Sequence, residues 1–213
     1  MSSERTPPLE MSARRHYSVH EIYWMAHHAA RTLRSTVRSR GGRGRAFTER
    51  ILLAVTEVNG CALCAYGHSR LALKAGVSAE EIRALLGGVA SGVPDRELTA
   101  IVFAQHYADS RGHPDADAWR ELILTYGEEQ ALGILGAVRM IMLGNAVGIP
   151  WSSLLSRLGG KPDPESTLCY EIGTIVGSHL LTPVALVHGG ISELRGEPAI
   201  SFPPRHSATD GVA

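Results

Sequence analysis

The sequence predicts an all-α protein built around one core. Nearly every apolar segment repeats every three or four residues, as on one face of a helix, rather than alternating as in a strand. The separators are Pro and Gly at positions that begin or end helices. The 213 residues, 44% hydrophobic and 20% charged, are enough to bury a sizeable core. We therefore expect one helical domain over residues 17–197, between a loose N-terminal segment (1–16) and a flexible C-terminal tail (198–213).

Three helices are expected before residue 77. The first runs from about Ser18 to the Gly41–Gly42 break. The second is short, from Phe47 to Val58, and stops at Asn59–Gly60. The third begins there and continues to Gly76, which fits the left-handed residue that often ends a helix.

Capping residues and prolines mark the later helices. Ser78 and Glu81 have the spacing of a capping box, in which each side chain satisfies a backbone N–H of the other, so a fourth helix begins there. A late helix with an apolar face from Leu168 to Leu180 is expected to begin behind Asp163 as its N-cap and to end before Pro183. Four prolines stand where the first residue of a helix is expected: Pro94, Pro114, Pro150 and Pro164.

Charge is uneven along the chain although the net charge is zero. Residues 1–50 hold ten arginines against four acidic residues. The densest stretch, 34–45, has no aromatic residue to stack on a base and no nucleic-acid-binding motif, so we interpret it as a solvated connector and expect no nucleic-acid partner. Three cysteines are too few for a disulfide-stapled secreted domain, and no apolar signal run follows Met1, so a cytoplasmic location is expected.

One apolar stretch is long enough to span a bilayer. Residues 172–192 contain no Asp, Glu, Lys or Arg. However, His179, Pro183, His188 and four glycines interrupt the stretch, so we expect a buried segment rather than a membrane span. This late helix and residues 184–187 offer more apolar surface than a monomer readily hides, which predicts self-association.

The residues best suited to chemistry lie between Thr48 and His68. On an α-helix, Cys61, Cys64 and His68 fall within an arc of roughly 60°. Two thiols separated by two residues in the first turn of a helix can close a disulfide, and free N–H groups there favour a thiolate. The imidazole four residues beyond Cys64 is within reach of that sulfur, where it can accept a proton or stabilise the thiolate.

Other interpretations of this pattern stay open at this point. Two small residues on a packed helix with a core histidine would show the same letters. Two cysteines, a histidine and a carboxylate can hold zinc, but no second ligand pair stands at a familiar spacing, so neither a metal nor another cofactor is expected. A thioredoxin fold is disfavoured, because its CxxC motif belongs beside strand patterns that this chain lacks.

Four residues at fixed spacings resemble a known family. Glu49, Cys61, Cys64 and His68 match the E-x11-CxxC-x3-H pattern of the alkylhydroperoxidase D group, within the carboxymuconolactone decarboxylase-like superfamily. Residues 72–82 also resemble the sequence usually found after that histidine. The clear resemblance covers about residues 45–90. It implies a helical bundle of the alkylhydroperoxidase D / carboxymuconolactone decarboxylase-like type that usually assembles as a homo-oligomer.

The resemblance also implies a thiol-dependent peroxidase. One thiolate reduces a hydroperoxide and becomes a sulfenic acid, the other condenses with it to a disulfide, and a lipoyl-type or thioredoxin-like dithiol restores both. By position, Glu49 and His68 would relay the proton taken from a cysteine. Glu49 can also be a charge that is simply stabilised by the start of its helix. Some family members have a second histidine between the cysteines, and here that position is Leu63.

The two sulfurs are expected to have different roles. Cys61 is nearest the helix N-terminus, so we expect it to be the more exposed sulfur, which resolves the sulfenic acid and faces the reductant. Cys64 is one turn from His68 and is expected to attack the peroxide. Cys169 is interpreted as a buried small hydrophobe outside the disulfide.

Two alternative functions are kept. A carboxymuconolactone decarboxylase-like enzyme acting on a small ring would share the fold without needing two cysteines. A non-catalytic oligomeric redox sensor or scaffold would oxidise once and stop. Two further features are given lesser roles: Glu57 is off the family pattern, and residues 144–151 are interpreted as a turn between packed helices rather than a pocket lining.

Overall fold

The computed structural model of the chain describes residues 14–39 and 41–202. These residues form helices and no strands, which confirms the predicted all-α class. The helices are α1 Val19–Ala30, α2 Leu33–Arg38, α3 Arg45–Asn59, α4 Ala62–Lys74, α5 Ala79–Leu86, α6 Asp95–Asp109, α7 Ala116–Tyr126, α8 Glu128–Leu158 and α9 Leu168–Leu194.

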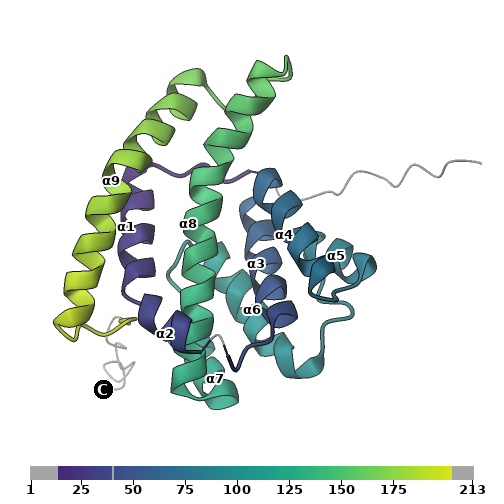
Figure 1. Cartoon of the computed structure of the whole chain (residues 1–213), viewed down its shortest axis with the longest axis vertical. Helices are drawn as coiled ribbons and strands as arrows, with labels where there is room; N and C mark the ends of the chain where they lie inside the picture. Colours follow the sequence, from purple (N-terminus) through teal and green to yellow (C-terminus); the bar gives the residue numbers. More distant parts are fainter. Residues whose placement is uncertain (1–13, 40, 203–213) are drawn as a thin grey trace, which may run out of the picture.

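Helix α8 runs through the middle of the molecule, as Figure 1 shows, with α1 and α9 on one side and α3 to α6 on the other. The main core lies where α3, α5, α6 and α8 meet, and it includes Ile51, Leu85, Ile101 and Leu135, all fully buried. A smaller apolar cluster joins α1 and α8 to the start of α4. The position of α8 between these clusters explains why so much of its length is buried.

The early helices lie close to their predicted positions. Ser18 begins α1 with a complete capping box to Glu21, and Gly60 ends α3 in a left-handed conformation (φ 69°). The predicted first helix is two helices, because the chain leaves α1 at Arg31 and continues as α2 after Thr32. The hydroxyl group of Thr32 donates to the carbonyl of Ala29 at this break (3.2 Å), where side-chain bonding competes with helix continuation.

Half of the capping box predicted at α5 is present. The Ser78 hydroxyl accepts the N–H of Glu81 at 3.1 Å, as expected. The Glu81 carboxylate does not return the bond but pairs with Arg50, which also contacts Glu97 at 3.0 Å. An ion pair that joins α3, α5 and α6 therefore takes the place of the second capping bond.

The predictions for two prolines are wrong. Pro150 lies inside α8 and Pro183 inside α9, so neither begins nor ends a helix. An interior proline removes one backbone hydrogen bond and costs about 3 kcal/mol. In α8, buried residues on both sides of Pro150, including Ile149 and Ser153, hold the helix together across it. Local sequence rules do not register this tertiary packing.

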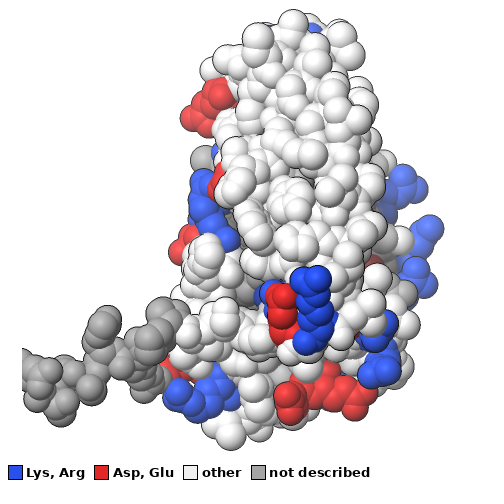
Figure 2. Space-filling model, turned by 90° about the vertical axis from the view of Figure 1, so that its left-hand side faces the viewer, with Lys and Arg blue, Asp and Glu red and all other residues white. Residues whose placement is uncertain are grey.

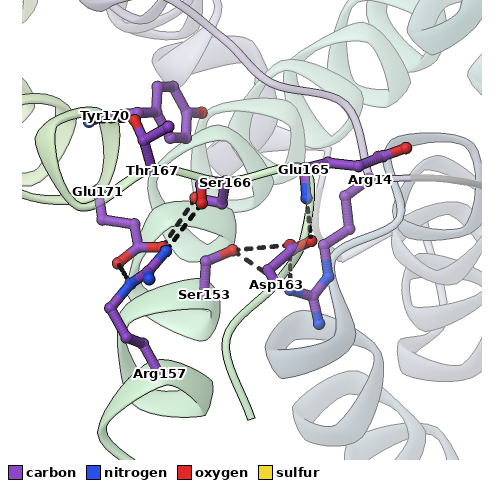
Figure 3. Close-up of polar contacts among 9 residues, drawn as sticks. All are labelled: Arg14, Ser153, Arg157, Asp163, Glu165, Ser166, Thr167, Tyr170 and Glu171. Carbon is purple, nitrogen blue, oxygen red and sulfur yellow. Dashed lines mark hydrogen bonds and ion pairs between the residues drawn. The ribbon is translucent and has the colours of Figure 1, made fainter.

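Two ion pairs fix the turn between α8 and α9 (Figure 3). Arg157 of α8 makes a bidentate contact with the fully buried Glu171 of α9, with both distances 2.8 Å. Asp163 in the turn accepts hydrogen bonds from Arg14 at 2.6 Å and from Ser153 at 3.2 Å. Asp163 is therefore not the predicted N-cap of the late helix.

The N-cap of α9 is Thr167, which accepts the N–H of Tyr170 at 3.2 Å. Helices α1 and α9 then pack closely side by side. At Gly189 of α9, an added Cβ atom would lie 2.2 Å from the carbonyl oxygen of His27 in α1. Only glycine permits this approach, which explains one of the glycines in the late apolar stretch.

The predicted terminal segments lie mostly outside the described residues, which exclude 1–13 and 203–213. The parts that are described contact the domain. The backbone N–H of Arg15 donates to the carbonyl of Asn59 at 3.1 Å, and the carbonyl of Ala199 accepts from Arg139 at 2.8 Å. The domain limits at residues 17 and 197 stay predictions.

Candidate active site

The cysteine pair sits at the junction of α3 and α4. Because Gly60 turns the chain sharply, α4 starts immediately after α3 ends and the two helices run back along each other. Cys61 is the N-cap of α4, and its sulfur accepts the N–H of Cys64 at 3.3 Å. The CxxC motif therefore occupies the first turn of a helix, as its spacing predicts.

The same turn brings Glu49 and His68 together. Nδ1 of His68 lies 2.9 Å from a carboxylate oxygen of Glu49, across the α3–α4 contact. Glu49 is buried, and His68 is partly exposed. A hydrogen bond from Nδ1–H to the carboxylate leaves Nε2 as the nitrogen that can accept a proton. Among the described residues, no hydrogen bond joins His68 to either sulfur.

Both sulfurs rest on one glycine of α8. A Cβ atom added at Gly148 would lie 3.0 Å from the Sγ of Cys61 and 3.0 Å from that of Cys64. The thiol of Cys64 also lies 3.7 Å from the carbonyl oxygen of Gly144, one turn earlier on the same helix. None of the three cysteines forms a disulfide in this structure.

The surrounding groups shift the pKa values of the two thiols in opposite directions. The hydrogen bond from the Cys64 side chain lowers the pKa of Cys61, and the backbone N–H groups of Cys64 and Leu63 and the charge of Arg14 act in the same direction against the effect of burial. The pKa of Cys64 is raised, first by that same hydrogen bond and then by burial and the nearby Cys61 sulfur. The surroundings therefore favour a thiolate on Cys61 over a thiolate on Cys64.

Exposure of the two sulfurs is the reverse of the prediction. Cys61 is fully buried, in the cluster with Tyr17, Ile22, Ala146 and Ile149. Cys64 is partly exposed and lines a cavity of about 550 Å³ between α4, α8 and α9. The prediction failed because the side chains that cover Cys61 belong to α1 and α8 and the segment before α1, which the local helix geometry does not include.

The Cys64 cavity is mostly apolar. Its lining includes Leu63 from α4 and Met140, Leu143 and Val147 from α8. His179 and Pro183 contribute from α9. Residues 144–151 are therefore not a turn, as predicted, but a helical stretch whose Gly144 and Gly148 border the cysteines. The four-residue spacing of these glycines, one turn of a helix, is the sequence signal that would have placed them on one face.

The remaining candidates lie elsewhere or have other neighbours. Cys169 is exposed at the start of α9, so its interpretation as a buried residue is wrong. Glu57 is buried, and its carboxylate lies beside Gly88. Within residues 14–39 and 41–202, no group of three or more His, Cys, Asp or Glu side chains is arranged to hold a metal ion.

Comparison with known proteins gives one match. Residues 25–105 match the model of the carboxymuconolactone decarboxylase family. The matched residues run from α1 into α6 and include all four residues of the E-x11-CxxC-x3-H pattern. Neither the curated proteins nor the solved structures gave a match. Helices α7, α8 and α9, and with them one wall of the Cys64 cavity, lie outside the matched residues.

Proposed function

We propose that the chain, whose residues 25–105 match the carboxymuconolactone decarboxylase family model, works as a thiol-dependent peroxidase of the alkylhydroperoxidase D kind. One observation carries the proposal. Two thiols pack against the same glycine, one buried with a lowered pKa and the other open to an apolar cavity. If the two cysteines were only small packing residues of the core, their sulfurs would not need to differ in solvent exposure and in pKa.

Cys64 attacks the peroxide, because it is the sulfur that lines the cavity. Its proton passes first to the Cys61 thiolate, which is the base nearest to it. The Cys64 thiolate then attacks one peroxide oxygen, the O–O bond breaks, and the products are a sulfenic acid on Cys64 and an alkoxide, which takes up a proton to become the alcohol. In this scheme Cys61 is buried and does not meet the peroxide, and its lowered pKa favours loss of the proton it has accepted, which prepares it for the next step.

Cys61 resolves the sulfenic acid. After returning its proton to the medium, its thiolate attacks the Cys64 sulfur, the S–O bond breaks, and hydroxide leaves. Over both steps, one thiol, one thiolate and one hydroperoxide are consumed. The products are one disulfide, one alcohol and one hydroxide ion. His68 is held by Glu49 and lies one helical turn from Cys64, and we assign it to take up a proton on Nε2 and pass that proton to these leaving oxygens.

An external dithiol closes the cycle at Cys64. In the disulfide, Cys64 is the accessible sulfur, so the attacking thiolate of a lipoyl-type or thioredoxin-like reductant forms its mixed disulfide there. Cys61 then leaves as a thiolate, and a low pKa favours a leaving thiol. This reverses the assignment predicted from helix position, in which Cys61 faced the reductant.

The cavity lining favours an organic hydroperoxide with an apolar chain. Leu63, at the position between the cysteines, is half exposed in this cavity and adds apolar surface rather than a proton donor. Apolar surface removed from water contributes about 25 cal/mol per Å². We therefore propose a bulky alkyl hydroperoxide as a better substrate than hydrogen peroxide.

Steady-state turnover tests the function. Purified protein with a dihydrolipoyl donor and cumene hydroperoxide should consume many equivalents of peroxide, and replacement of either cysteine should stop turnover. A redox sensor would consume one equivalent and stop. A decarboxylase acting on a small lactone would retain its activity after replacement of either cysteine.

We also propose a homo-oligomer formed through the outer face of α9. Within the described residues, two helices are long and apolar enough to span a membrane, α8 and α9. The most apolar part of α8 is 72% buried and that of α9 only 22%, so the prediction that residues 172–192 form a buried segment is wrong. In Figure 2 the face over α9 is almost free of charged side chains in its upper part. Its exposed apolar residues include Leu168, Ile172, Val176, Leu180, Val184, Val187, Ile191 and Leu194.

A second copy of the chain would cover this face, because contiguous exposed apolar surface of this extent marks an interface. We propose that this oligomer is a cytoplasmic protein and that neither a membrane nor a nucleic acid is its partner. Sedimentation should give a multiple of 22.9 kDa at micromolar concentration. Replacing Leu180 and Val184 by Ser should yield monomers, and partition of the wild-type chain into vesicles would oppose the proposal.

A further inference from the structure

A second cavity lies apart from the cysteine pair, between α1, the end of α6 and α8. Its volume is about 540 Å³, within the usual range of small-molecule sites. Its walls share no residue with the Cys64 cavity. Trp24 and Met25 of α1 and Met142 of α8 form an apolar surface, and Arg139 of α8 supplies a charge beside it.

Arg139 is a buried cation that has no acidic partner among the described residues. Only 4% of its surface is exposed. Its guanidinium donates to the Tyr107 hydroxyl at 2.9 Å, to the His28 carbonyl at 3.3 Å and to the Ala199 carbonyl at 2.8 Å. All three acceptors are neutral, and within the described part of the chain no carboxylate lies in ion-pair range of it. A guanidinium has five N–H groups, so two are left for another acceptor.

The other charges at this cavity do not neutralise Arg139. Glu21 is engaged by Arg111 at 2.7 Å, so these two form a pair of their own. Burial, together with the charge of Arg139, lowers the pKa of His28 to about 3, which makes that imidazole neutral at pH 7. Burying an unpaired charge is costly, and proteins keep one where a ligand supplies the opposite charge.

The backbone at the rim of the cavity is also unusual. Arg111 has φ 53°, and it is the one residue other than glycine with a positive φ among those described. Side chains with a Cβ are strained in this region, and such residues cluster at ligand sites. In this conformation the Arg111 side chain contacts Glu21 and lies over the Tyr17 ring.

We propose that this cavity binds an apolar monocarboxylate. The carboxylate accepts the free N–H groups of Arg139, which suit two parallel hydrogen bonds, and the hydrocarbon part lies against Trp24, Met25 and Met142. The site shares no residue with the cysteine cavity, so a test of carboxylate binding does not depend on whether the peroxidase proposal is correct.

Calorimetric titration with 2-naphthoate tests the site, with 2-naphthol as the probe of similar size without the charge. We expect 2-naphthoate to bind the wild-type chain at least ~10-fold more tightly than 2-naphthol, since hydrogen bonds to a charged group contribute more than neutral ones. Arg139→Met should remove this preference and Arg139→Lys should keep part of it. Equal affinity for both probes, or no binding of 2-naphthoate, would overturn the proposal.

A second variant guards against misfolding of the first. Arg139→Met loses three internal hydrogen bonds, so Trp24→Ala is used to remove part of the apolar wall while the charge stays in place. Trp24 is partly exposed, so its replacement leaves the main core intact, and this variant should bind 2-naphthoate more weakly than the wild type. Binding should survive in the chain with both Cys61 and Cys64 replaced by Ser. Unchanged binding in Trp24→Ala, or lost binding in the cysteine variant, would place the ligand elsewhere and contradict the proposal.

Discussion

The carboxylate of Glu49 and Nδ1 of His68 lie 2.9 Å apart, although 18 residues separate them in the chain. The sharp turn at Gly60 places the middle of α3 beside the middle of α4 and so brings the two side chains together. The pair orients the imidazole on the same helix as both cysteines. This relationship decides what the imidazole can do, since its free nitrogen is the one left for proton transfer.

Replacing Glu49 by Gln or His68 by Asn should lower the peroxidase kcat on the order of a hundredfold, the lower end of the usual contribution of a positioned acid–base group. The double variant should be no slower than the slower single variant, because the two residues act as one unit. Stopped-flow measurement of peroxide reduction over a range of pH checks this. A pH profile identical to that of the wild type would assign Glu49 a structural role only.

Gly148→Ala should reduce turnover by roughly tenfold, because its Cβ would lie 3.0 Å from both sulfurs and force at least one of them to move. Gly144→Ala is the matched control on the same helix. Its Cβ would meet only Ile141, at 3.9 Å, and should leave turnover nearly unchanged. Equal activity of the two variants would mean that the contact of the sulfurs with α8 is unimportant.

Cys64→Ala should raise the pKa of Cys61, because the hydrogen bond from the Cys64 side chain is the largest cause of its lowered value. The Cys61 thiolate would then appear only at higher pH than in the wild-type chain. Ultraviolet thiolate absorbance during a pH titration measures this, with Cys169→Ser in both proteins to remove the third thiol. If the pKa of Cys61 does not change, the hydrogen bond from Cys64 is not its main cause. The backbone N–H groups at the start of α4 would then be the main cause of the lowered pKa.

The Arg157–Glu171 pair should make stability depend on acid pH. The arginine holds the pKa of Glu171 below its ordinary value of 4.5, so the pair stabilises the folded state above that value. This stability is lost as the pH falls through the lower folded-state pKa, because the carboxylate is then protonated. Glu171→Gln should lower Tm at pH 7, and the difference from the wild type should shrink in acid. A constant difference down to pH 3 would contradict this account.

The sequence was sufficient to predict the elements whose causes are local. The helix class, the start of the first helix near Ser18, the stops at Gly60 and Gly76 and the CxxC–His68 face all follow from spacing within one or two turns. The family match over residues 25–105 agrees with the resemblance based on that spacing.

The features that were mispredicted depend on long-range packing. The burial of Cys61 comes from Tyr17, Ile22 and Ile149, which lie far from it in the chain. Helix α8 continues through Pro150 because buried contacts on both sides outweigh the missing hydrogen bond. No sequence pattern around Arg139 predicts the second cavity. A single arginine in an apolar helix does not indicate whether a carboxylate from another helix lies opposite it.

Trapping the sulfenic acid tests the central claim most directly. Cys61→Ser and Cys64→Ser, each in a Cys169→Ser background, would be treated with one equivalent of cumene hydroperoxide in the presence of dimedone and analysed by peptide mass spectrometry. We expect a dimedone adduct on Cys64 in the Cys61→Ser variant and none on Cys61 in the Cys64→Ser variant. An adduct on Cys61 alone would contradict it, because the buried sulfur would then be the one that meets the peroxide.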